Sequence, residues 1–314
     1  MSFTAQDVAN LRQKTGAGMM ECKNALKEAS GNFERAREIL RQKGLTAANK
    51  KADKIALEGI VISNISNDKK TGSIAEINSQ TDFVAKNESF QELARTIINA
   101  IVANKPKSIN ELLSLKEKNT PIQELISTNI ATTGENIQVR RFETFELGSN
   151  SGIIGTYIHP VGNKIGVLVK LHTKQETPTC IVELEQLAKD IAMHIAACQP
   201  QAEYIDKNQI PKEVIESEKR IELGKEDLAK KPKEIAEKIV QGRLDKILSQ
   251  RCLLDQPYIK DPSVTIEKLI QDKSKKLNID VQITKFVRYN VGEAAEENLS
   301  LGTQAYKETS TITS

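Results

Sequence analysis

Side chains that commonly act in catalysis or hold metals are few and scattered in this sequence of 314 residues. The three histidines, His159, His172 and His194, fall on different predicted elements, and no HxH or HExxH pattern places two of them on one helix face. The four cysteines, at positions 22, 180, 198 and 252, are widely spaced and form no CxxC pair. We therefore expect no metal site, no disulfide framework and no histidine acid–base catalysis, and we expect the cysteines to be reduced and buried.

Glycine-rich loops that cradle phosphates are also missing from the sequence. There is no GxxxxGKS or GxxxxGKT motif of the P-loop nucleotide hydrolases. Residues 16–18 (GAG) have neither a preceding strand nor the third glycine of a dinucleotide fingerprint, so they indicate a helix break. We therefore expect the chain to bind neither GTP nor any cofactor of its own.

One methionine suggests a contact surface. The helix predicted to begin near Met19 has an apolar stripe at positions 22, 25, 26 and 29, and this stripe accounts for Met19 but not for Met20. Met20 shares its face with Lys23, Asn24 and Lys27. An apolar and flexible side chain that points at water is a candidate partner contact.

Residues 80–86 (QTDFVAK) follow a predicted strand and allow two interpretations. In the first, Thr81 or Asp82 caps a helical turn and Phe83 packs beneath that turn. In the second, the carboxylate of Asp82 and the ring of Phe83 act together as a wedge against another protein. The residues alone leave both open.

Composition and charge favour a helix-rich protein that does not depend on nucleic acid. The 45 basic and 42 acidic residues give a net charge of only +3, whereas binding to a phosphate backbone requires a clustered basic excess. Aromatic residues make up 4% and tryptophan is absent, so few rings are available for base stacking. No apolar run approaches the roughly 20 residues of a membrane span, and the first thirty residues lack a signal-peptide core. We expect a cytoplasmic protein without membrane contact.

Periodicity and breaks predict a helix-rich α+β fold with several parts. Three short helices occupy residues 1–46, with a capping box at Thr4 and Asp7 and a stop at Gly44. Charged residues with apolar positions at 214, 221, 228, 235, 239 and 244, broken at Lys231-Pro232, predict a helical hairpin. The predicted parts are an N-terminal domain (1–46), a linker (47–57), core subdomain 1 (58–145), core subdomain 2 (146–205), the hairpin insertion (206–255), a return to the core (256–293) and a polar tail (294–314).

The two core subdomains are predicted to be repeats of each other. Gly166 lies 94 positions after Gly72, and the same shift brings Leu93 onto Leu187 together with the other apolar positions of a strand pair and a helix. The strand pairs are 58–65 with 73–78 and 152–158 with 165–172. His194 falls in the middle of the second helix, and the residues alone allow it to be a half-buried surface histidine.

Several of these segments, in order, resemble the bacterial elongation factor Ts family. The matching segments are 11–12 with 15–23 (TGAGMMECK), 80–86 (QTDFVAK), 134–137 (GENI) with 140–141 (RR), 191–194 (IAMH) with 196–197, and 231–236 (KPKEIA). The resemblance covers residues 3 to 293, and the tail after Gly292-Glu293 matches weakly.

The resemblance implies a fold and a function. It implies a ubiquitin-associated-like three-helix domain, a core of two subdomains and a coiled-coil hairpin. It also implies a guanine-nucleotide exchange factor for elongation factor Tu, which binds the GDP-bound and nucleotide-free partner, displaces its Mg²⁺ and GDP, and performs no bond chemistry. A homodimer is left open.

The resemblance also implies the residues that contact the partner. They are Arg12, Met19, Met20, Thr81, Asp82, Phe83, Val84 and His194. Phe83 would wedge in near the magnesium site, Asp82 would disturb the surroundings of the ion, and His194 would approach the phosphate-binding loop.

Two other classes of function remain open at this stage. In the first, the three-helix domain binds a partner peptide and the core is only a scaffold, which would make the protein a non-catalytic adapter. In the second, the protein is an RNA-associated translation protein that uses Arg140, Arg141 and the lysines of residues 50–54. A steep salt dependence of RNA affinity would mark the second class.

Overall fold

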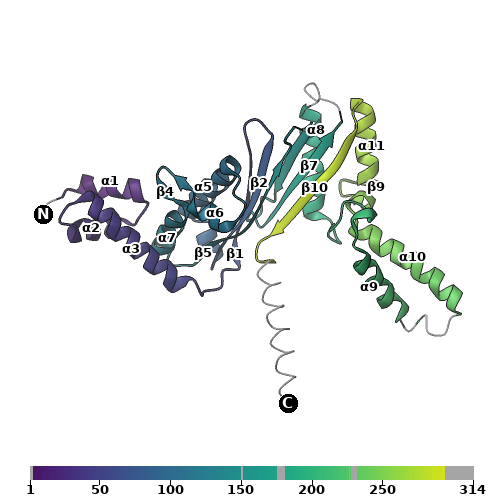
Figure 1. Cartoon of the computed structure of the whole chain (residues 1–314), viewed down its shortest axis with the longest axis horizontal. Helices are drawn as coiled ribbons and strands as arrows, with labels where there is room; N and C mark the ends of the chain where they lie inside the picture. Colours follow the sequence, from purple (N-terminus) through teal and green to yellow (C-terminus); the bar gives the residue numbers. More distant parts are fainter. Residues whose placement is uncertain (1–2, 150, 175–180, 226, 228–231, 294–314) are drawn as a thin grey trace, which may run out of the picture. The chain divides into compact units, whose positions relative to one another are not determined.

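The structure, a computed structural model, describes residues 3–149, 151–174, 181–225, 227 and 232–293. Helices and strands both occur throughout this part of the chain, which confirms the α+β class (Figure 1). The chain divides into two units, which we describe separately. Unit 1 contains the chain up to Thr144, Ile158–Gly166 and the described residues from Tyr289 onward, and unit 2 contains Phe145–Tyr157 and Val167–Arg288.

Three helices open unit 1: α1 (Ala5–Thr15), α2 (Met19–Glu28) and α3 (Phe33–Lys51). The predicted capping box is present, because the Thr4 hydroxyl accepts from the Asp7 amide and the Asp7 carboxylate accepts from the Thr4 amide at 2.7 Å. Gly16 ends α1 at a φ of 71°, a left-handed conformation that favours glycine. The three helices close over a small apolar core that includes Val8, Leu11, Cys22, Ala25, Leu26, Ala36 and Ile39.

The third helix is longer than the sequence predicts. We expected a stop at Gly44 followed by a helical linker, but α3 continues without a break through Gly44 to Lys51. Gly44 is buried against α7 (Ile122–Thr133), and a Cβ atom there would lie 3.5 Å from the carbonyl oxygen of Ser127. Packing against α7 therefore outweighs the low helix propensity of glycine, which costs only about 1 kcal/mol.

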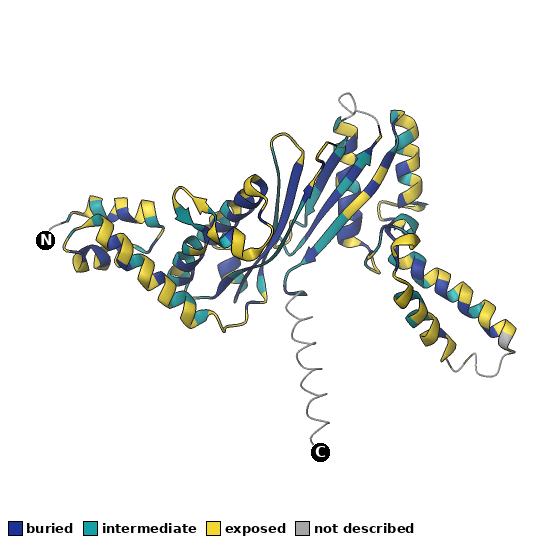
Figure 2. Ribbon diagram, viewed as in Figure 1, coloured by how far each residue is buried: buried dark blue, intermediate teal, exposed yellow. Residues whose placement is uncertain are grey.

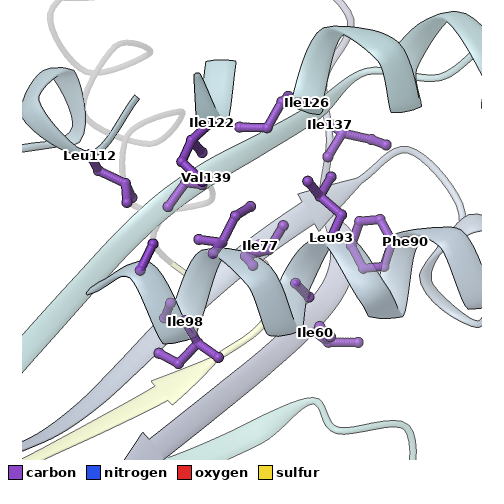
Figure 3. Close-up of a cluster of buried hydrophobic side chains, with 14 of the residues drawn as sticks. Ile60, Ile77, Phe90, Leu93, Ile98, Leu112, Ile122, Ile126, Ile137 and Val139 are labelled. Carbon is purple, nitrogen blue, oxygen red and sulfur yellow. The ribbon is translucent and has the colours of Figure 1, made fainter. Parts of the chain in front are cut away.

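A sheet with the strand order β1-β2-β5 forms the centre of unit 1. Its strands are β1 (Glu58–Ile65), β2 (Thr71–Ser79) and β5 (Ile137–Glu146), and β1 runs antiparallel to β2 with Glu58 opposite Ser79. Helices α5 (Glu88–Asn104) and α7 bury their apolar faces in one cluster with strand residues such as Ile60, Ile77 and Val139 (Figure 3). Along the chain, α5 is followed by α6 (Ile109–Ser114), β3 (Lys116–Glu117) and β4 (Thr120–Pro121) before α7 begins.

A second sheet has the strand order β10-β7-β6. Its strands are β6 (Gly152–Ile158), β7 (Ile165–Thr173) and β10 (Val281–Asn290), and unit 2 also contains α8 (Ile181–Ala197) and α11 (Ile266–Leu277). A Cβ atom on Gly155 would lie 2.5 Å from that of Ala188, so glycine is needed for the close approach of β6 and α8. The strand pairs and helices of both predicted repeats are present, as β1-β2-α5 and β6-β7-α8.

Two antiparallel helices, α9 (Lys212–Leu223) and α10 (Lys233–Arg251), follow in unit 2. They pair with each other (Figure 1), and Figure 2 shows that both keep exposed outer faces. Short elements flank them: η1 (Lys207–Gln209), η3 (Leu253–Asp255), β8 (Pro257–Tyr258) and β9 (Asp261–Thr265). Among the described helices, none is both long enough and apolar enough to cross a membrane.

The contacts between α9 and α10 differ in part from the predicted seam. Ile221 and Ile235 are exposed rather than paired, while Val240, Leu244 and Leu248 are buried, and position 228 lies outside the described residues. The carboxylate of Glu222 occupies the interior instead and forms ion pairs with Lys225 and with Arg243. A buried carboxylate needs such partners, and the neighbouring Ile221 lies on the exposed side of the helix.

Candidate partner-binding surface

The segment after β2 forms one short helical turn that displays an aromatic ring. Thr81 is the N-cap of α4 (Asp82–Ala85), and its side chain accepts a hydrogen bond from the amide of Val84. Val84 and Ala85 are buried in the core of unit 1 and fix the inner side of the turn. Phe83 points outward with 81% of its surface exposed. The capping interpretation is therefore right about Thr81 but wrong about Phe83, because Val84 and Ala85 are the residues that pack beneath the turn.

The carboxylate of Asp82 lies beside this ring in a charged environment. Lys86 Nζ lies 2.6 Å from Asp82 Oδ2, one helical turn further along the chain. This hydrogen bond, together with the charges of Lys86 and Lys164, lowers the pKa of Asp82. Asp82 is therefore ionised at neutral pH and is partly exposed, so the turn presents a negative charge next to an apolar ring.

Contacts from outside the turn hold it at both ends. At its start, Glu135 Oε2 accepts from the amide of Thr81 at 3.0 Å and Glu135 Oε1 accepts from the Thr81 hydroxyl at 2.7 Å. At its end, Gln91 Nε2 donates to the carbonyl oxygen of Ala85 at 2.6 Å. The ring of Phe83 is thus exposed on a well-anchored backbone.

Two of the three predicted contacts of the N-terminal helices, Arg12 and Met19, line one hollow of unit 1. Met20 is 62% exposed, as predicted from its helix face, and Met19 is 47% exposed. Arg12 and Met19 line the hollow together with residues of α5 and α7, among them Ser89, Glu92, Thr96, Leu125 and Asn129.

The remaining predicted histidine contact is buried. His194 is 1% exposed, so the interpretation as a half-buried surface residue is wrong. The amide of Ile259 lies 3.2 Å from His194 Nδ1, which must therefore accept, and His194 Nε2 donates to Gln256 Oε1 at 3.0 Å. Burial lowers the pKa of His194 and keeps its ring neutral. His194 lies in unit 2 and lines a hollow there with Gln250, Asp255 and Gln256.

Glu76, a buried carboxylate of unit 1, escaped the sequence reasoning. Arg141, considered there for RNA contact, donates from Nε to Glu76 Oε2 at 2.8 Å and lies 4.2 Å from the ring centre of Tyr289. The fully buried Glu76 also accepts from the amide of Gly292 at 2.9 Å. Arg141 is thus half-buried, with its guanidinium held by Glu76 and Tyr289. The alternation of apolar and polar residues along a strand does not reveal that a carboxylate such as that of Glu76 is buried.

The cysteines and possible metal ligands show no cluster that could do chemistry. Cys22, Cys198 and Cys252 are free and buried, and position 180 lies outside the described residues. Burial raises the pKa of the Cys252 thiol to about 11, so it is a poor nucleophile. Within the part of the chain that the structure describes, no group of three or more histidine, cysteine, aspartate or glutamate residues is placed to hold a metal ion.

These features define a class of protein: an α+β factor whose exposed and firmly held side chains are suited to contact with another protein. Comparison with known proteins gives the family. The model of the family described as Elongation factor TS matches residues 80–293. The chain is 45% identical over 299 residues to elongation factor Ts of Nostoc sp., with 95% of each chain covered. It is 42% identical over 299 residues to elongation factor Ts of Syntrophotalea carbinolica, again with 95% of each chain covered.

The chain belongs to the elongation factor Ts family. Its function is therefore that of a nucleotide exchange factor for elongation factor Tu in translation elongation. The adapter and RNA-associated alternatives are set aside by this result. Which side chains carry out exchange is a separate question that the geometry of the surface addresses.

Proposed function

We propose that the turn of Thr81, Asp82 and Phe83 is the element with which this exchange factor opens the nucleotide site of elongation factor Tu. The observation that supports the proposal is the 81% exposure of Phe83 on a turn anchored at both ends. Burying an aromatic ring of this kind in a partner yields about 1.5 to 3 kcal/mol. Because the ring is exposed in the free chain, its burial can contribute this free energy when the complex forms.

Exchange requires coupling between two binding events rather than bond chemistry. A factor that binds the nucleotide-free partner better than the loaded partner lowers the affinity for nucleotide by the same ratio. A thousandfold loss of GDP affinity corresponds to about 4 kcal/mol of coupling. The ring of Phe83 supplies a large part of this amount if it is buried only when the nucleotide site is open.

Asp82 contributes through charge. Its carboxylate is ionised and stands next to the ring, so a wedge that carries Phe83 toward the partner also brings a negative charge. Oxygen ligands hold Mg²⁺ in nucleotide sites, and a competing carboxylate disturbs that arrangement. Loss of the ion removes counter-charge from the diphosphate, which weakens its binding, and release of GDP follows.

The N-terminal helices provide a second contact area in this proposal. Met20 and Met19 are exposed, and methionine side chains adapt to an apolar partner surface at low cost. Arg12 in the same hollow adds a positive charge. These residues bind the partner in both nucleotide states and therefore set affinity, whereas Phe83 and Asp82 set the difference between the states.

His194 has a less direct role in this proposal. Both of its ring nitrogens are engaged inside unit 2, so contact with a phosphate-binding loop requires that Gln256 or the segment at Ile259 gives way. We infer that His194 first holds this segment in place.

Because elongation takes place in the cytoplasm, we also infer a cytoplasmic location, while a homodimer stays a prediction.

The proposal is tested by nucleotide release from the partner. Elongation factor Tu loaded with a fluorescent GDP analogue is mixed with excess unlabelled GDP and increasing amounts of the full chain in a stopped-flow instrument. We expect release to accelerate and then to saturate with chain concentration. A chain that binds the partner without accelerating release would instead support the adapter function.

A further inference from the structure

A carboxylate from a distant part of the sequence, that of Glu135, holds the turn that carries Phe83 through two hydrogen bonds, which we call the grip. Glu135 lies just after α7, yet both of its oxygens accept from Thr81, one from the amide at 3.0 Å and one from the hydroxyl at 2.7 Å. Both residues are half-buried. Hydrogen bonds to a charged acceptor are among the stronger ones in proteins, and a two-point grip also fixes direction.

The grip sets the orientation of the Thr81 hydroxyl. Because the hydroxyl proton points at Glu135, its lone pairs remain free to accept from the amide of Val84, which lies 3.4 Å away. One hydroxyl therefore links the carboxylate to the first turn of α4. Without Glu135 the hydroxyl is free to rotate, and the cap that starts α4 is weakened.

Glu135 is itself held by the residues around it. Gly134 ends α7 at a φ of 74°, a left-handed conformation that turns the chain sharply. Asn136 is buried, and its side-chain amide donates to the carbonyl oxygen of Lys54 at 2.7 Å. Ile137 begins β5 in the core of unit 1. The carboxylate of Glu135 is thus fixed by the core of unit 1, and its hydrogen bonds to Thr81 fix the exposed turn in the same way.

We propose that Glu135 is a positioning residue for nucleotide exchange, which acts on the partner only through the turn of Thr81, Asp82 and Phe83. This inference rests on the proposed function of that turn. A turn that is ordered in advance does not lose conformational entropy when it enters the partner, so more of the ring's burial is available to open the nucleotide site. Glu135 touches neither partner nor nucleotide in this role.

The first test is Glu135→Gln in the full chain. The amide of glutamine replaces one acceptor with a donor, which then faces one of the two donors of Thr81. We expect the saturating rate of GDP release to fall about tenfold, as when a hydrogen bond to a charged acceptor is lost. The chain concentration at half-saturation should change little, because the contacts of the N-terminal helices are intact. Amide hydrogen exchange should accelerate at residues 81–85 and not in β1, β5 or α5.

The matched control is Glu117→Gln, which makes the same chemical change at an exposed carboxylate in β3. It should leave both release and hydrogen exchange unchanged. Thr81→Val removes the hydroxyl and should resemble Glu135→Gln. Glu135→Asp keeps two acceptor oxygens on a shorter stem and should recover part of the rate.

A double-mutant cycle separates this inference from the proposed function. If Glu135 acts through Phe83, Glu135→Gln should slow release far less in a Phe83→Ala background than in the native chain. Equal slowing in both backgrounds would overturn the positioning role, as would native release by a Glu135→Gln chain with lost local protection. Native release by Phe83→Ala alone would instead overturn the proposed function of the turn.

Discussion

The exposure of Phe83 needs a physical explanation. Leaving an aromatic ring in water gives up about 1.5 to 3 kcal/mol of free energy that its burial would supply. The cap at Thr81 and the buried side chains of Val84 and Ala85 keep it there. The sequence could not decide this orientation. A cap is compatible with a ring that points inward or outward, and only packing against the core selects Val84 and Ala85 as the inner residues.

Phe83→Ala separates binding from folding. Since the ring is exposed, its truncation should change the free energy of unfolding by less than about 0.5 kcal/mol, whereas a core phenylalanine would cost about 3 to 5 kcal/mol. Catalysed GDP release should slow at least about tenfold, or about 1.4 kcal/mol. Thermal unfolding and stopped-flow release at matched Mg²⁺ measure the two effects. A large drop in melting temperature with near-normal release per folded molecule would contradict the wedge.

His194 predicts a pH dependence of stability. Its pKa is lowered in the folded chain by burial, so as the pH falls below the ordinary histidine value of about 6.5 the unfolded chain takes up a proton that the folded chain does not. The free energy of unfolding should therefore fall as the pH falls from 7 toward the lowered pKa. His194→Gln should remove this part of the slope in denaturant titrations at several pH values. An unchanged slope would show that His194 titrates normally.

At the scale of elements, α9 and α10 show which features of a helical hairpin the spacing of apolar residues can predict. The hairpin and its break at Pro232 followed from heptad-like spacing and a proline, and both are present. The assignment of Ile221 to the seam was wrong, because the buried ion pairs of Glu222 occupy that level of the hairpin. Hydrophobic patterns cannot anticipate a buried charged residue whose partners include Arg243 on the opposite helix.

Shortening the hairpin tests whether it belongs to a folding core. Deletion of residues 216–241, closed by a short glycine–serine linker, leaves Leu244, Leu248 and Ile210, which pack together at the base. The remaining chain should stay soluble, unfold cooperatively and retain exchange, because the deleted segment mainly pairs with itself. Calorimetry and GDP release measure these properties. Insolubility or a broad unfolding transition would place the hairpin within the core.

At the scale of the whole molecule, we expect the chain to act through contact surfaces rather than through a nucleotide site of its own. Its described residues show an exposed ring on an anchored turn, exposed methionines near a hollow, and a buried histidine. An exchange factor needs only a difference in affinity between two states of its partner. The elongation factor Ts family acts in this way as a nucleotide exchange factor.

The chain alone should therefore not bind GDP. It has no phosphate loop, and the hollow near Arg12 combines a single positive side chain with the carboxylate of Glu92. Equilibrium dialysis with labelled GDP and no partner should give no binding at micromolar concentrations. Micromolar affinity would mean that the chain carries a nucleotide site of its own, and the release assay would then need reinterpretation.

The sequence by itself determined the three N-terminal helices, the two strand pairs with their helices, the break at Gly16 and the exposure of Met20. These depend on local periodicity, caps and backbone restrictions, which neighbouring residues dictate. The tertiary structure decided that α3 continues through Gly44, that His194 is buried, that Phe83 faces outward and that Glu135 grips Thr81. Each of these depends on residues that are distant in the sequence, and the free energy of packing and of paired polar groups exceeds the local preferences that a sequence displays.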